Sequence, residues 1–179
     1  MDEIIRRTRD YVLTHSFVSG FHGIDHWDRV YQNGQRLLTA EVNLLVVGLF
    51  AYLHDSCREG DGDDLQHGPR AARLIEELRD TLLKDVSNDE IELLKEACRL
   101  HTTCLKTGNP TIDACFDADR LDLGRVGIIP DPDYLATEIG KSIAKKEFWE
   151  PSDLLIKAFS PGMLYDMLSY VSTATLSFA

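Results

Sequence analysis

The chain has 179 residues, of which 44% are hydrophobic and 27% are charged, proportions that are usual for a globular protein. Acidic residues outnumber basic ones by 30 to 19, which gives a formal net charge of −11. This sign argues against sequence-independent binding of nucleic acid, which needs a basic surface. No apolar stretch reaches the roughly 18 residues of a membrane span, and the amphipathic start lacks the apolar core of a signal peptide. We therefore expect a cytoplasmic protein, a single domain over residues 1–179, with no membrane contact.

The spacing of apolar residues predicts helices from the start of the chain. The first is expected over about residues 2–16 and the second over about 25–41. Asn43 is the expected N-cap of a third helix over about 44–56. Its nearly continuous apolar run, 42–53, indicates a central position in the fold.

Residues 58–66 contain two glycines and four acidic side chains and are expected to form a loop. Loops in such positions often carry functional groups. Pro69 suits the first turn of a fourth helix, which we expect to end near Leu83.

The second half of the chain also reads as helical. Ser87-Asn88-Asp89-Glu90 matches a capping box and predicts a fifth helix ending near Thr103. Asn109-Pro110 predicts the start of a sixth helix, ending near Asp122. After a loop over 127–133, two or three shorter helices are expected, the last over about 163–177. No segment alternates convincingly enough for a strand, so we expect an all-α fold.

A histidine and an aspartate, His54-Asp55, stand side by side where the apolar run ends. Both are costly to bury without a partner, and neutral imidazole and carboxylate are good ligands of first-row metals. His26, in the second predicted helix, and Asp119, in the sixth, can reach the same point, because metal sites in helical bundles are built from converging helices. The four side chains predict a divalent metal site.

The surroundings of these four residues resemble the motifs of a known family. Asp25-His26-Trp27-Asp28-Arg29-Val30 is similar to the first motif of the HD-domain superfamily of metal-dependent phosphohydrolases, and Ala118-Asp119-Arg120-Leu121 to its last. The resemblance covers about residues 22–127. It implies a compact orthogonal helix bundle of the HD-domain type, a small stand-alone HD protein.

Asp117 competes with Asp119 for the fourth ligand position. Two residues apart on a helix, they point about 200° apart and cannot both face one ion. The resemblance favours Asp119, and Asp117 and Asp122 are then expected to form salt bridges or to support the ligands.

Two further histidines extend the expected site. His67 and His101 resemble additional histidines with which related members hold a second metal or contact a substrate phosphate. The alternative is that they are capping or surface residues. His22 is expected to be structural or at the rim, and His15 to lie at the surface. The ligand types suit Mn, Fe, Co, Ni, Mg or Zn, with one ion or two.

A bound divalent ion would lower the pKa of a coordinated water and neutralise charge on a phosphoryl oxygen. The resemblance therefore implies hydrolysis of a small phosphorylated substrate, a phosphate ester or a nucleotide phosphate. Arg58, Arg29 and Arg70 are the candidates to bind the phosphate. Asp55 is also a candidate catalytic group, and Glu59 is the candidate for proton transfer, together with the other acids of the loop.

Three alternatives stay open at this point. Some HD proteins have similar ligands but use two irons to activate oxygen, and His67 and His101 are compatible with that chemistry. A non-catalytic metal- or ligand-binding HD module is the second, and a catalytic thiol at Cys57 the third. No Gly-Tyr-Pro segment follows His101, which argues against a cyclic-di-GMP phosphodiesterase. Substrate identity and oligomeric state are not predicted.

Overall fold

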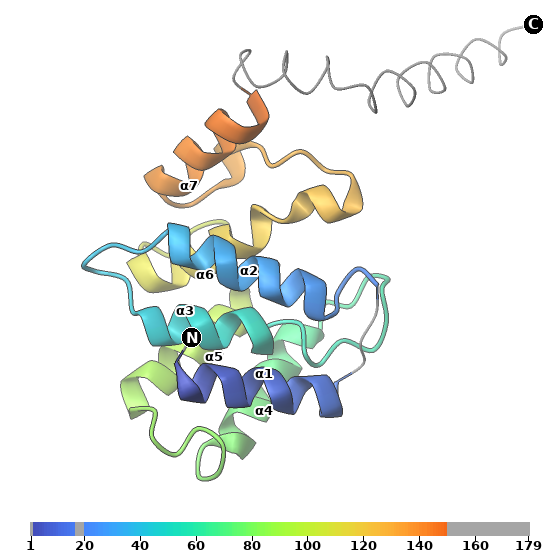
Figure 1. Cartoon of the computed structure of the whole chain (residues 1–179), viewed down its shortest axis with the longest axis vertical. Helices are drawn as coiled ribbons and strands as arrows, with labels where there is room; N and C mark the ends of the chain where they lie inside the picture. The colour runs from blue at the N-terminus through green and yellow to red at the C-terminus, as the bar shows by residue number, and fades with distance from the viewer. Residues whose placement is uncertain (1, 17–19, 150–179) are drawn as a thin grey trace, which may run out of the picture.

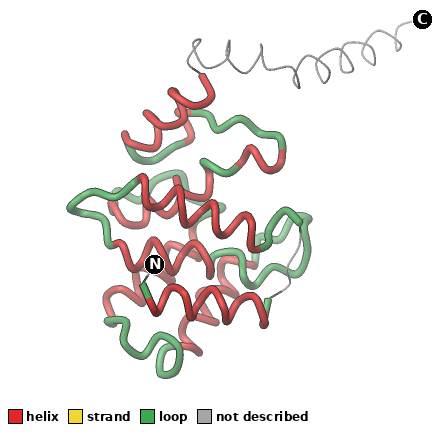
Figure 2. Tube along the Cα trace, viewed as in Figure 1, coloured by secondary structure: helices red, strands yellow, loops and turns green. Residues whose placement is uncertain are grey.

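Helices joined by loops make up the structure, a computed structural model that describes residues 2–16 and 20–149. Those residues contain no strand, which confirms the all-α prediction (Figure 2). The α-helices are α1 (Glu3–His15), α2 (Ile24–Arg36), α3 (Leu44–Leu53), α4 (His67–Leu78), α5 (Asn88–Leu100), α6 (Pro110–Arg120) and α7 (Glu138–Ala144). Shorter turns of helix are η1 (Leu123–Val126), η2 (Pro132–Tyr134) and η3 (Lys145–Trp149). No described helix has the length and apolar character needed to cross a membrane.

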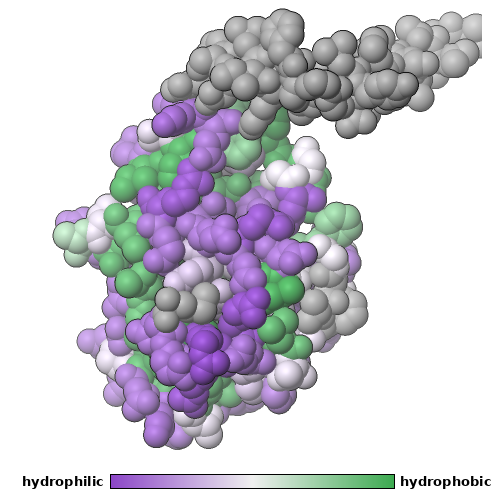
Figure 3. Space-filling model, in the orientation of Figure 1, coloured by the Kyte–Doolittle hydropathy of each residue, from purple (hydrophilic) through white to green (hydrophobic). Residues whose placement is uncertain are grey.

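The apolar helix α3 lies at the centre of the fold, as its sequence predicts. It packs against α1, α2, α5 and α6 (Figure 1), and every side chain from Val46 to Leu53 is buried. Asn43 is its N-cap, since the Asn43 side chain accepts a hydrogen bond from the Val46 N–H at 3.1 Å. Hydrophilic side chains cover most of the face in Figure 3, so the apolar residues are concentrated inside.

Several helices end earlier than the apolar spacing predicts. The second helix ends at Arg36 rather than near residue 41, because the Leu37 N–H bonds to Gly34 O at 3.1 Å and tightens the last turn. The third ends at Leu53 because both the Ser56 hydroxyl and the Ser56 N–H bond to Leu53 O.

The fourth and fifth helices are also shorter than expected. The fourth ends at Leu78 rather than near Leu83, and the turn that follows buries the Leu83 side chain in the core. The fifth ends at Leu100 rather than near Thr103. After α4 the apolar residues Leu82 and Leu83 continue the helical spacing. After α5 the chain tightens into a turn, in which the Thr103 N–H bonds to Leu100 O at 3.0 Å.

The predicted starts of α5 and α6 are confirmed. Ser87 and Glu90 form the capping box, with both reciprocal hydrogen bonds present. Asn109 caps α6 through its side-chain oxygen, which accepts from the N–H groups of Thr111 and Ile112. The last predicted helix, 163–177, lies outside the described residues.

Two close helix contacts bring the site-bearing elements together. A Cβ on Gly68 would lie 2.3 Å from the carbonyl oxygen of Cys98, so α4 approaches the backbone of α5 closely. A Cβ on Gly34 would lie 2.5 Å from a methyl carbon of Val47, where α2 crosses α3. Only a residue without a side chain fits at either contact.

Candidate metal centre

Five helices, α2 to α6, bring candidate ligands to the same region, at or next to a helix end, and α3 brings two, His54 and Asp55. His26 lies in the first turn of α2, and His54 directly follows α3. His67 begins α4, His101 directly follows α5, and Asp119 lies in the last turn of α6. All four histidines are at most 5% exposed.

The first cluster consists of His26, His54, Asp55 and Asp119. The Nε2 atoms of His26 and His54 are 3.3 Å apart. Asp119 Oδ1 lies 3.4 Å from His26 Nε2 and 3.8 Å from His54 Nε2, and Asp55 Oδ2 lies 3.7 Å from both nitrogens. The four side chains that the sequence predicts as ligands therefore face one another.

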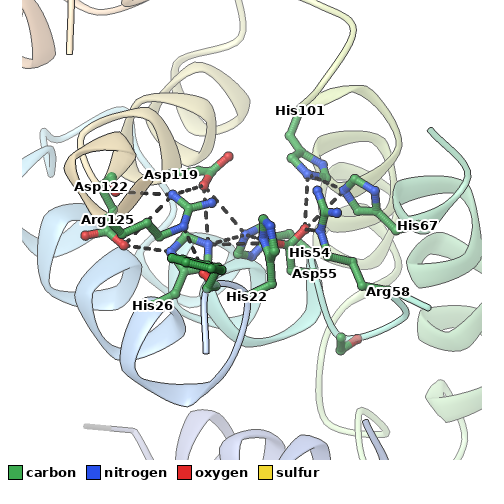
Figure 4. A network of polar contacts seen from close by, with 12 residues as sticks. His22, His26, His54, Asp55, Arg58, His67, His101, Asp119, Asp122 and Arg125 are labelled. Atoms are coloured by element: carbon green, nitrogen blue, oxygen red, sulfur yellow. Dashed lines mark hydrogen bonds and ion pairs between the residues drawn. The ribbon is translucent and has the colours of Figure 1, made fainter. Parts of the chain in front are cut away.

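The second cluster consists of Asp55, His67 and His101. Their ligand atoms also approach closely: the two Nε2 atoms are 2.9 Å apart, and Asp55 Oδ1 lies 3.1 Å from His67 Nε2 and 3.7 Å from His101 Nε2. Asp55 thus belongs to both clusters, one carboxylate oxygen in each. Figure 4 shows Asp55 between the two groups of imidazoles.

Hydrogen bonds at Nδ1 fix the orientation of the imidazoles. His54 Nδ1 lies 3.1 Å from Phe50 O and His101 Nδ1 lies 2.8 Å from Cys98 O. A carbonyl only accepts, so these nitrogens carry a proton. In the neutral ring Nε2 is then a bare lone pair, which is the form that binds a metal.

The remaining two rings follow the same rule. His26 Nδ1 lies 2.7 Å from the Asp122 carboxylate, and His67 Nδ1 bonds to the carbonyl of Asp64. The Nε2 atoms of His26 and His54 therefore point at each other, and so do those of His67 and His101. Such a contact is unfavourable unless a proton or a metal ion lies between the two nitrogens.

Burial and charge set the protonation of the two clusters. Burial lowers the pKa of His54 to about 3, so this ring is neutral at pH 7. Burial opposes charge on His101 as well, but the Asp55 carboxylate, 3.7 Å away, raises its pKa above the ordinary value. Asp55 is buried too, yet the neighbouring imidazoles of His54, His101 and His22 hold its pKa well below its usual range. The centre therefore holds a buried negative charge among imidazoles.

The first cluster fits a divalent cation. Asp119 Oδ1 is buried and accepts no hydrogen bond from the described residues, although burying such an atom unpaired is costly. Ligands bound to one ion at about 2.1 Å lie about 3.0 to 3.4 Å from one another, close to the observed separations of 3.3 to 3.8 Å. Three groups of side chains within these clusters could each hold a metal ion: His26, His54 and Asp55; His54, His101 and Asp119; and Asp55, His67 and His101.

Asp117 and Asp122 have separate roles, as expected. The Asp117 carboxylate points away from both clusters and accepts hydrogen bonds from Ala136 N at 2.7 Å and from Thr137 N at 2.8 Å. It thereby anchors the start of α7. Asp122 bonds to His26 and to Arg29 Nε, at 2.7 and 2.6 Å, and so orients a ligand.

His22 is closer to the centre than the sequence predicts. Its Nδ1 lies 2.9 Å from Asp55 Oδ2, so it holds the carboxylate shared by both clusters. Because His22 precedes α2 in a glycine-containing turn, no helical spacing links it to His54-Asp55. By contrast His15 is exposed and stacks on Tyr11, as predicted for a surface residue.

A cavity of about 470 Å³ opens over the two clusters. Its described lining includes Asp119 and His67 at the centre and two arginines, Arg58 and Arg125. Arg58 Nε lies 3.1 Å from Asp55 Oδ1, and an Arg125 terminal nitrogen lies 3.8 Å from Asp119 Oδ1 (Figure 4). Two cations thus flank the candidate ligands.

Arg125 is absent from the sequence expectations because it lies in η1, outside every motif. Its Nε donates to the carbonyl of Phe21, 104 residues earlier in the chain, at 3.0 Å. This long-range contact, together with a hydrogen bond to Asp122 O at 3.2 Å, holds it beside the centre.

Other expected residues do not line this cavity. Arg29 pairs with Asp122, and Arg70 pairs with Asp64 and donates to Cys57 O. Glu59 is 79% exposed and its carboxylate lies 3.8 Å from Arg70. It lines a smaller neighbouring cavity instead. The Cys57 thiol is half-buried, and burial raises its pKa, which disfavours the thiolate that a nucleophile requires.

Comparisons with protein-family models, with curated proteins and with solved structures found no match for this chain. Its function is therefore inferred from the site itself.

Proposed function

We propose that the protein is a metal-dependent phosphohydrolase that cleaves a small phosphate ester, with one or two divalent ions held by the two clusters. The observation that carries the proposal is the position of Arg58 and Arg125 at the edge of the paired clusters, inside one cavity. Cations beside a metal centre suit a dianionic phosphate, because phosphoryl transfer depends mainly on positioning and charge stabilisation.

The residues divide into ligands and phosphate-binding groups. His26, His54 and Asp119 would hold one ion, His67 and His101 a second, and Asp55 both. A divalent ion supplies a nucleophile by lowering the pKa of water, and it withdraws charge from a phosphoryl oxygen. The guanidinium groups of Arg58 and Arg125 would bind the other phosphate oxygens, which accept two hydrogen bonds from one arginine.

A second candidate function is oxygen activation by two irons. The shared carboxylate of Asp55 favours it, since that group reaches both clusters through different oxygens. Imidazole and carboxylate groups are also suitable ligands for iron. Metal content and the reaction observed distinguish the two functions.

The test is a metal measurement followed by a phosphatase screen. The purified protein, loaded in turn with Mn, Co, Ni and Fe, should release inorganic phosphate from small phosphate monoesters. His26→Gln should remove the ion of the first cluster and lower turnover more than a hundredfold. His15→Gln, which removes an exposed imidazole that contacts Tyr11 and Thr14 and no cluster residue, should leave both metal content and turnover unchanged.

Two results would contradict the proposal. Phosphate release that persists undiminished in His26→Gln would show that the first cluster takes no part in the reaction. Oxygen consumption by the iron-loaded protein, without phosphate release under any metal, would favour the oxygenase.

A further inference from the structure

The cavity above the clusters has two walls of different chemistry. One wall is the loop after α3, which contributes Asp61, Asp63 and Asp64 to the lining. The other follows α6 and contributes the apolar side chains of Leu123, Val126 and Ile128. Arg58 and Arg125 line the same cavity as the candidate ligands His67 and Asp119, beside which a phosphate would bind. The space between the two walls is therefore where the rest of a substrate would lie.

The acidic wall is held in place from both ends. An Arg58 terminal nitrogen donates to Gly62 O at 3.2 Å, which ties the middle of the loop to the centre. Asp64 forms an ion pair with Arg70 and accepts from the N–H of Glu59 at 3.2 Å. These contacts fix the loop against the cavity.

Asp61 and Asp63 keep their charge uncompensated in this arrangement. Both are exposed, and neither forms an ion pair with any residue in the described ranges 2–16 and 20–149. The two arginines of the cavity bond instead to Asp55 and to the carbonyls of Gly62 and Phe21. A positively charged group on the substrate would therefore be attracted electrostatically to Asp61 and Asp63.

The apolar wall is exposed as well. Val126 is 42% and Ile128 is 53% exposed, in and just after η1, where Gly127 turns the chain with a φ of 78°. Among the described lining residues the only rings are the imidazoles of His22 and His67, which contact Asp55, so no Phe, Tyr or Trp side chain is offered for a nucleobase to stack on. A short aliphatic stem fits this wall better.

We propose that the substrate is a phosphate monoester of a small aliphatic alcohol that carries a cationic group, such as an ammonium, rather than a nucleotide or an acidic ester. The phosphate lies between Arg58 and Arg125, the stem on Val126 and Ile128, and the cation beside Asp61 and Asp63. This substrate class rests on the proposed function, because that function places the phosphate at the metal centre. The preference of the cavity for a cationic ligand is measurable without turnover.

The test uses three phosphonates of equal length, in which a methylene replaces the ester oxygen and prevents hydrolysis. They are 3-aminopropylphosphonate, 3-hydroxypropylphosphonate and 2-carboxyethylphosphonate, which end in a cation, a neutral group and an anion. Calorimetry on the manganese-loaded protein should give the tightest binding for the amine, about tenfold tighter than the alcohol, as expected for two screened charges near the surface. The carboxylate should bind most weakly.

Charge removal supplies the matched comparison. Asp61→Asn combined with Asp63→Asn should reduce the ratio between amine and alcohol to near one. Asp80→Asn combined with Asp85→Asn removes two exposed charges beyond the far end of α4, about 16 Å along that helix from His67, and should leave the ratio unchanged. A ratio unaltered by the first pair would overturn the proposal.

Each remaining outcome is also decisive. Equal binding of the amine and the alcohol, tighter binding of the carboxylate, or no binding of any phosphonate would overturn the substrate class. Hydrolysis of the corresponding esters without charge preference would leave the phosphohydrolase intact while the substrate class fails. Selective binding of the amine with no hydrolysis of its ester would support the charge preference of the cavity and contradict the proposed phosphohydrolase activity.

Discussion

At the scale of single residues, backbone carbonyls determine which imidazole nitrogen faces the centre. His54 and His101 directly follow helices, and each uses a carbonyl of its own last turn, Phe50 O or Cys98 O, as the acceptor for Nδ1. Cys98 O lies at a helix end, where carbonyls lack intrahelical partners, whereas Phe50 O also accepts the backbone N–H of His54 at 3.0 Å. In both cases the bond to Nδ1 aims Nε2 at the cluster. A helix end thus orients a metal ligand without any additional side chain.

Asp119 and Asp117, both on α6, allow a test of which carboxylate is the metal ligand. Asp119→Asn should lower the metal content of the purified protein sharply, because an amide oxygen is a weaker ligand than a carboxylate, and should leave the folded structure intact. Asp117→Asn should retain the metal but lower the free energy of unfolding by about 1–3 kcal/mol, because it weakens the buried hydrogen bonds to Ala136 and Thr137. Metal analysis and chemical denaturation measure both effects. Loss of metal in Asp117→Asn alone would reverse the assignment.

At the scale of elements, the site depends on how closely the helices approach. His67 and His101 lie on α4 and α5, and Gly68 allows these helices to touch where its Cα faces the Cys98 carbonyl. Rigid helices transmit a change at such a contact to the side chains beside it.

Gly68→Ala should therefore affect both stability and the second cluster. The added methyl group would lie 2.3 Å from a backbone oxygen, so α4 and α5 must move apart, at a cost of about 1–3 kcal/mol. Metal titration should show weaker binding at the second cluster and an unchanged first site. Gly20→Ala, with no atom near the added Cβ, is the control, and an equal loss of affinity there would refute the explanation.

At the scale of the whole molecule, a central apolar helix supports a buried polar centre. The helix α3 supplies the core through its entirely buried side chains 46–53 and ends at His54-Asp55. The surrounding helices α2, α5 and α6 pack on α3 and present their ligands at the same place. Burying a carboxylate and several imidazoles there destabilises the fold unless a cation compensates them.

Metal removal should therefore make the protein sensitive to acid. The pKa of His54 is about 3 in the folded protein and 6.5 ordinarily, so between these values the unfolded chain binds the extra proton. The free energy of unfolding of the chelator-treated protein should fall as the pH decreases from about 6.5 toward 3. Urea denaturation at several pH values measures this. His54→Gln should show a shallower dependence, and an identical slope would exclude His54 as the cause.

The sequence by itself determined the features that depend on neighbouring residues. Asn43, the Ser87–Glu90 capping box and Asn109 act within three residues of their partners, so their patterns predict helix starts directly. The apolar run before His54 predicts a central helix for the same reason. Helix ends were predicted less well, since buried side chains such as Leu83 continue the apolar spacing into the following turn.

Only the tertiary structure decided which of these ends meet. The contacts of Asp122 with His26, of Arg125 with Phe21 and of His22 with Asp55 join residues 96, 104 and 33 positions apart. No local spacing encodes such contacts, because they depend on how α2, α3 and α6 pack around one core. The structure also decides which arginines line the cavity: Arg125 does, whereas Arg29 pairs with Asp122 and Arg70 with Asp64.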